Sequence, residues 1–203
     1  MDGTMNFRNT LYLGLALIGN HVFAQDLNLR YAELYNKQRY NQESSLVEVR
    51  SFLIDKQSQQ ACVIKQIIMY SKQHSEQLPL FATGEVKIPV DAHLRKVNPD
   101  IKISVADGQD CNFHYQFTSK RTPHNTITGK EALQYQMAFS QLMTNLSGRV
   151  GSWFVPKVTG VEVHFKDSSS TDKLWINEFT ATDNKHYELA IESITPLFDQ
   201  GSN

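Results

Sequence analysis

Residues 101–118 read IKISVADGQDCNFHYQFT and carry the clearest structural pattern in the chain. Apolar and polar residues alternate from Ile101 to Val105 and again from Cys111 to Phe117, the period expected of strands with one buried face. Asp107-Gly108 lies between the two runs and is typical of a tight turn. The stretch therefore predicts a β-hairpin, with Cys111 on its buried face.

Helical patterns flank this stretch on both sides. Residues 29–40 repeat apolar and aromatic side chains at three- and four-residue spacing. A longer helix is expected to begin at Thr128, which forms a capping box with Glu131, and to end at Ser147-Gly148. Its apolar face comprises Ala132, Tyr135, Phe139, Leu142, Met143 and Leu146.

Short extended segments account for most of the remaining chain. A short helix is expected at 90–97, and residues 194–198 are expected to pack back against the body. The predicted strands cover residues 46–55, 61–71, 80–82, 85–88, 153–158, 161–166, 173–179 and 186–192. These patterns predict an α+β fold, mainly antiparallel β-meander sheets packed with two principal helices. A duplicated helix-plus-meander unit, at 29–71 and 129–192, is a further possibility without a residue-level repeat.

The first 24 residues predict a cleaved signal peptide. An apolar core, residues 11–19, follows Arg8, and Val22 and Ala24 stand at the −3 and −1 positions of a cleavage site. A buried amino-terminal helix is the alternative. Residues 25–203 then form a single α+β domain, or two structural subunits split near 119–128. We expect export to the periplasm, with secretion as the alternative.

The two cysteines, Cys62 and Cys111, both lie after the predicted signal. Exported chains meet an oxidising compartment, so we expect a Cys62–Cys111 disulfide. Two buried thiols, or a redox or metal role, are the alternatives.

Composition argues against several classes of partner. Twenty basic and 21 acidic residues leave a net charge of −1, so no basic excess exists to neutralise nucleic acid. No polybasic run, second long apolar segment or lipid-attachment cysteine indicates a membrane anchor. No nucleotide-binding or metalloprotease motif is present, and we expect no cofactor and no metal.

Polar residues of the predicted strands suggest two kinds of chemistry. His114, His164 and His186 would form a metal or acid–base site if their strands were neighbours, although separate surface histidines are the favoured interpretation. The carboxylates Glu162, Glu178, Glu188 and Glu192 would serve glycan hydrolysis if two faced each other across a cleft. Ordinary solvated positions are again the favoured interpretation.

Aromatic residues indicate a binding face. In residues 174–177, Leu174 and Ile176 form the better core set, which leaves Trp175 and Asn177 on the opposite side of the strand. Such a ring beside a polar amide can stack on a sugar or hold a peptide. A second layer covering that side is the alternative. Trp153-Phe154 would contribute to binding, or would instead form a hydrophobic edge or enter the core.

Four short motifs resemble a family of secreted gammaproteobacterial proteins catalogued as a domain of unknown function. They are Tyr31-Ala32-Glu33-Leu34-Tyr35, Cys62-Val63-Ile64-Lys65, Trp153-Phe154-Val155-Pro156, and the ending from Tyr187 to Pro196. The resemblance implies a periplasmic protein and transfers no catalytic residue.

The sequence favours a non-enzymatic envelope module that binds a protein or glycan partner through Trp153, Phe154, Trp175 and Asn177. The alternative is a hydrolase of cell-envelope polymers that uses Glu162 or Glu188 with His164 or His186. A structural role with homo-oligomerisation is the third hypothesis.

Overall fold

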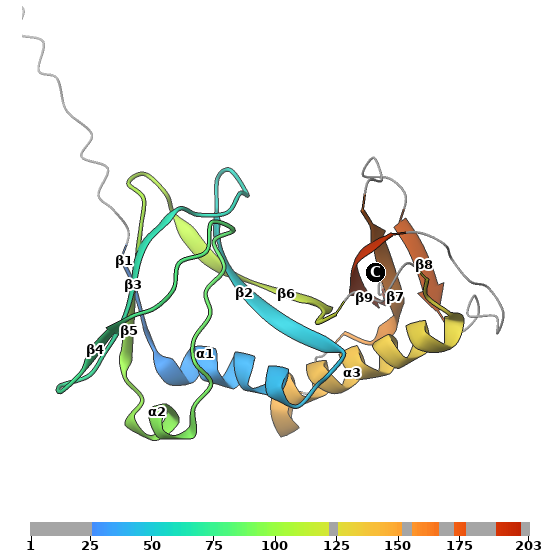
Figure 1. Ribbon diagram of the computed structural model, residues 1–203, viewed down its shortest axis with the longest axis horizontal. Helices are drawn as coiled ribbons and strands as arrows, with labels where there is room; N and C mark the ends of the chain where they lie inside the picture. The colour runs from blue at the N-terminus through green and yellow to red at the C-terminus, as the bar shows by residue number, and fades with distance from the viewer. Residues whose placement is uncertain (1–25, 122–125, 152–155, 167–172, 178–189, 200–203) are drawn as a thin grey trace, which may run out of the picture.

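The computed structural model describes residues 26–121, 126–151, 156–166, 173–177 and 190–199. These residues form three antiparallel sheets combined with helices, which confirms the α+β class (Figure 1). The helices are α1 (Tyr31–Gln38), the 3-10 helix η1 (Arg39–Gln42), α2 (Ala92–Val97) and α3 (Gly129–Gly151). The strands are β1 (Asp26–Arg30), β2 (Val47–Asp55), β3 (Ile64–Tyr70), β4 (Ser75–Gln77), β5 (Asp100–Val105), β6 (Cys111–Ser119), β7 (Val158–Phe165), β8 (Lys173–Asn177) and β9 (Ile191–Phe198).

The amino-terminal sheet has the strand order β1-β5-β3-β4. Helix α1 follows β1 directly and buries Tyr31 and Leu34 in the core beside this sheet. The Tyr31 hydroxyl donates to the carbonyl of Pro89 at 2.6 Å and accepts from the N–H of Asp91 at 3.0 Å. The helix begins two residues later than the predicted Leu29, because Leu29 and Arg30 belong to β1.

The expected hairpin of residues 101–118 is wrong in its pairing, although both strands form. Strand β5 pairs with β1 and β3, whereas β6 pairs with β2 along its whole length, from Cys111 opposite Asp55 to Ser119 opposite Val47. The turn therefore carries the chain from one sheet to another. It is held there by Asp55, whose carboxylate accepts the N–H of Asp110 at 3.0 Å.

The β2–β6 ribbon lies between the amino-terminal sheet and the other end of the molecule (Figure 1). Its residues join two core clusters, since Leu53 is buried in the first and Val47 in the second. The predicted disulfide is confirmed: Cys62 precedes β3 and bonds Cys111 at the start of β6. It therefore ties the amino-terminal sheet to the ribbon.

The carboxy-terminal sheet has the strand order β8-β7-β9, and α3 packs against it (Figure 1). All six predicted apolar residues of α3 are buried in, or packed against, the core cluster between this helix and the sheet. The predicted capping box forms, because the N–H of Thr128 donates to the Glu131 carboxylate at 2.7 Å and the backbone N–H of Glu131 donates to Thr128 Oγ1 at 3.2 Å. Gly148, with φ of 65° and ψ of −173°, interrupts the helical geometry where the sequence predicts the helix end.

Other expectations need correction. Residues 80–82 and 85–88 are not strands; Glu85 makes an isolated bridge to Phe52, and the residues around it run as loop. Residues 194–198 pack back against the body as expected, and they do so as part of strand β9. The expected split near residues 119–128 stays a prediction. Among the described residues, no helix has the length and apolar character needed to cross a membrane.

Candidate functional site

The carboxy-terminal sheet turns one face towards α3 and the other away from it. Ile176 is fully buried and Leu174 packs against the same core, as the sequence predicts for this pair. Trp175, between them, is 62% exposed. Asn177 follows on the same side as Trp175, because side chains alternate along a strand. At this exposure, the alternative of a second layer over Trp175 is not seen among the described residues.

Neighbouring strands add polar side chains beside the tryptophan. Glu162 on β7 lies directly opposite Trp175 on β8, and Thr195 on β9 lies opposite Glu162 on its other side. Directly paired residues of antiparallel strands point to the same face. His164 belongs to this face as well. We call the side that carries these five residues the outer face: Glu162, His164, Trp175, Asn177 and Thr195.

Specific contacts order the polar part of the outer face. His164 Nε2 lies 2.9 Å from Thr195 Oγ1, a hydrogen-bond distance, and 3.8 Å from Glu162 Oε1. The Glu162 and His164 side chains are 18% and 29% exposed. The outer face therefore combines an exposed indole with a carboxylate, an imidazole and a hydroxyl that are held by neighbouring strands.

Gly160 sets the approach of β7 to β8 at the end of this face. It pairs with Asn177, and a Cβ at this position would meet the carbonyl oxygen of Ile176 at 2.5 Å. Side chains do not tolerate such a contact, so glycine permits the strands to lie this close.

The structure tests the placement of the other candidate residues only in part. Trp153, Phe154, Glu178, Glu188 and His186 lie outside the described residues. His114 is on β6, which pairs with β2 and not with β7, so strand pairing does not create the neighbourhood that a joint site of His114 and His164 would require. Within the described residues, no three His, Cys, Asp or Glu side chains gather as a metal site requires.

Thr195 is the residue of this site that the sequence prediction missed. It lies in a segment expected to pack against the body but not expected to form a strand, and it belongs to β9. The segment lacks a clean alternation and contains Pro196, so it carries no clear strand signal.

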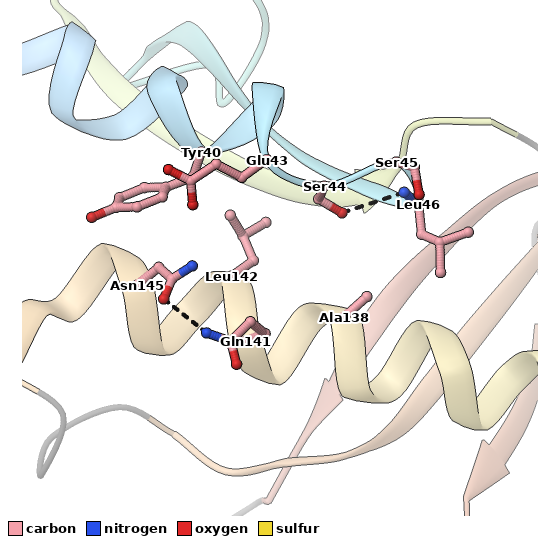
Figure 2. A pocket seen from close by; sticks show the side chains of 9 residues that line it. All are labelled: Tyr40, Glu43, Ser44, Ser45, Leu46, Ala138, Gln141, Leu142 and Asn145. Atoms are coloured by element: carbon pink, nitrogen blue, oxygen red, sulfur yellow. Dashed lines mark hydrogen bonds between the residues drawn. The ribbon is translucent and has the colours of Figure 1, made fainter.

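A cavity of about 290 Å³ lies between α3 and the segment that joins η1 to β2. Figure 2 shows Leu142 of α3 between the two elements, with Tyr40 across from the helix. Polar residues of its rim bond within the protein: Gln141 Nε2 donates to Asn145 Oδ1 at 2.9 Å, and Ser44 Oγ accepts the N–H of Leu46. The cavity lies at a junction of elements, and Glu43 is the one charged residue among the described residues that line it.

A second cavity of about 290 Å³ is lined by charged side chains that include Arg50, Glu85 and Lys87. Glu85 is buried and bonds Arg50, and Gln38 in the wall donates to the carbonyl of Val86 at 2.8 Å. The polar groups here satisfy one another, which indicates a structural role. The outer face, with its exposed indole, remains the better candidate site.

Comparison with known proteins identifies a family but no individual relative. No curated protein and no solved structure matches the chain. A family model described as "Protein of unknown function (DUF2987)" matches residues 23–165. The matched range includes Glu162 and His164 and ends before Trp175, Asn177 and Thr195. The protein therefore belongs to the DUF2987 family of proteins of unknown function.

Proposed function

We propose that this protein is an exported, non-enzymatic envelope module that binds a glycan through the outer face of its carboxy-terminal sheet. The observation that carries the proposal is the 62% exposure of Trp175 directly opposite Glu162. An indole exposed beside ordered polar groups offers one ligand both an aromatic stacking surface and hydrogen-bonding partners.

Export rests on the predicted signal peptide of residues 1–24 and on the Cys62–Cys111 disulfide. Disulfides persist in oxidising compartments such as the periplasm and are rare in the cytosol. The bond therefore supports an address outside the cytoplasm.

The composition of the outer face favours a glycan over a protein partner. Stable protein interfaces have an apolar centre built from several large side chains. The outer face instead surrounds one indole with Glu162, His164 and Thr195. A sugar has an apolar C–H face that stacks on such a ring and hydroxyl groups that bond carboxylates and hydroxyls at its edge.

The proposal is tested by cosedimentation of the purified protein with isolated peptidoglycan sacculi. Trp175→Ala is expected to lose at least tenfold in affinity, and Trp175→Phe is expected to lose less, because it keeps an aromatic surface. Met137→Ala is the matched control, since Met137 on α3 is also an exposed apolar residue, at 72%. Equal binding by native protein and Trp175→Ala would contradict the glycan proposal. Binding to an envelope protein fraction alone would assign the face to a protein partner.

The proximity of Glu162 and His164 favours one second candidate, hydrolysis of envelope polymers. A carboxylate beside an imidazole provides the groups for general acid–base chemistry. Release of soluble fragments from sacculi by the native protein, abolished in Glu162→Gln, would support hydrolysis. Sacculi that stay intact while the protein binds them would support the binding module.

A further inference from the structure

Strand β6 pairs with β2 along one edge. The hydrogen bonds of β2 show which main-chain groups β6 presents along its other edge. The N–H of Leu53 donates to the Gly84 carbonyl at 2.9 Å, and the Leu53 carbonyl accepts the N–H of Cys62 at 2.8 Å. Both main-chain groups of Leu53 therefore point away from β6. Opposite residues of an antiparallel pair exchange both of their hydrogen bonds or neither. Phe113, which lies opposite Leu53, consequently turns its own N–H and C=O away from β2.

The same reasoning applies at two further positions of β6. The Ser51 carbonyl accepts from the N–H of Val86 at 2.8 Å, so Tyr115 opposite Ser51 also faces outward. Val49 exchanges two 2.8 Å bonds with the Asn41 side chain, so Phe117 opposite Val49 faces outward.

The outward groups of Phe113, Tyr115 and Phe117 form what we call the β6 edge. Within the described residues, no hydrogen bond reaches these main-chain groups. Beyond them, the N–H of Ile194 donates to Ser119 Oγ at 3.0 Å, where β9 approaches the end of the strand. The β6 edge is therefore a short row of unpaired donors and acceptors, which only another extended backbone can complement fully.

The chemistry of the β6 edge does not protect it from pairing. Natural edge strands are blunted by lysines, prolines or bulges. Residues 112–118 read NFHYQFT, with neither Lys nor Pro and with aromatic residues at alternate positions, and the β2–β6 register is unbroken. Such a segment has a strong tendency to pair with another strand.

We propose that the β6 edge binds the β6 edge of a second copy of this chain, antiparallel and with the two-fold axis at Tyr115. In this register Tyr115 pairs with Tyr115, and Phe113 pairs with Phe117, so that every outward donor meets an outward acceptor. His114 lies opposite Gln116 of the second copy, in the pair type with the closest side chains. The result is one continuous sheet with strand order β2-β6-β6-β2.

Two features favour a second copy over an unrelated strand. The register is palindromic over Phe113–Phe117: it matches aromatic with aromatic and polar with polar residues. Like charges directly opposite each other would weaken the pairing, and none meet in this stretch. In addition, Tyr115 and Phe117 line an apolar groove of about 280 Å³ with Met143 and Leu146 of α3. Phe113 of the second copy, opposite Phe117, lies at this groove.

The proposal is tested by sedimentation velocity of the purified protein over a concentration series, with two matched variants. Both variants carry Gln116→Glu, which places a carboxylate opposite Arg50 of the same chain and is compatible with folding. The first adds His114→Glu, so that two carboxylates meet across the two-fold axis. The second adds His114→Lys, so that opposite charges meet.

The native protein and the His114→Lys/Gln116→Glu variant are expected to sediment as dimers, and the His114→Glu/Gln116→Glu variant as a monomer. His114 and Gln116 are exposed, so all three proteins should show the same circular dichroism spectrum and closely similar unfolding temperatures. A monomeric native protein, or two variants of equal mass, would overturn the proposal. Because Trp175 takes no part in this pairing, failure here leaves the glycan proposal standing.

Discussion

The guanidinium of Arg50 holds the carboxylate of Glu85 through two hydrogen bonds, although the Glu85 side chain is only 3% exposed. Arg50 lies on β2, and Glu85 lies in the loop that bridges to Phe52. Lys87 Nζ adds a second cation 3.4 Å from Glu85 Oε1. Burial by itself would raise the pKa of Glu85, but the hydrogen bonds and charge of Arg50, with the charge of Lys87, outweigh it and hold the pKa below its ordinary value.

The first prediction concerns loss of the arginine. Arg50→Met leaves a buried carboxylate without its main partner, and we expect the free energy of unfolding to fall by about 3–5 kcal/mol. Urea unfolding at neutral pH measures this loss. The double variant Arg50→Met/Glu85→Gln removes the uncompensated charge and should recover part of it. A double variant as unstable as the single one would contradict this account.

The second prediction is a pH dependence. The pKa of Glu85 is lower in the folded state than in the unfolded chain, where it is near 4.5. The ionised carboxylate therefore stabilises the fold above pH 4.5, and this contribution is lost as the pH falls through the pKa of the folded state. Other carboxylates titrate in the same range, so the useful measure is a difference. The stability of native protein minus that of Glu85→Gln should be largest above pH 4.5 and should shrink at lower pH. A difference that is flat with pH would contradict the assignment.

The third prediction concerns the Cys62–Cys111 bond, which closes a sequence separation of 49 residues. Replacing both cysteines by serine should lower the free energy of unfolding by about 2–4 kcal/mol, mainly because the unfolded chain is no longer constrained. Thermal unfolding with and without a thiol reductant measures this. The reductant should destabilise the native protein and leave the double-serine variant unchanged.

The fourth prediction concerns the close approach of β7 and β8. Gly160→Ala places a Cβ 2.5 Å from the Ile176 carbonyl oxygen, and overpacking of this kind costs about 1–3 kcal/mol. At Gly148 an added Cβ has nothing within 4 Å, so Gly148→Ala suffers strain from the positive φ alone and serves as a comparison. Chemical unfolding should rank Gly160→Ala as the less stable variant. The two strands must also separate to accommodate the methyl group, so the Gly160 variant should bind sacculi more weakly.

The fifth prediction concerns the start of α3. Thr128→Ala removes the Oγ1 acceptor of the capping box and should cost about 0.5–2 kcal/mol in unfolding free energy. Thr128→Ser retains the hydroxyl and should remain close to the native stability. An alanine variant as stable as the serine variant would show that the cap contributes little.

Features with a local physical cause were predictable from the sequence. The Thr128–Glu131 capping box joins residues three apart, and the buried face of α3 follows from helical spacing. The inward Ile176 and outward Trp175 likewise follow from strand alternation. Thr195 was missed because the strand that places it beside His164 lacks a clean alternation and carries Pro196.

The amino-acid sequence by itself determined the α+β class, most strand and helix positions, the disulfide and the outward direction of Trp175, because periodicity and capping act over a few residues. Only the tertiary structure decided which strands pair. Residues 101–118 form two strands as predicted, yet β5 joins β1 and β3 while β6 joins β2. Alternation specifies the buried face of a strand and not its neighbour; the neighbour is selected by contacts between residues far apart in the chain, such as Cys62 with Cys111 and Asp55 with Asp110. The outer face and the β6 edge both arise from that selection.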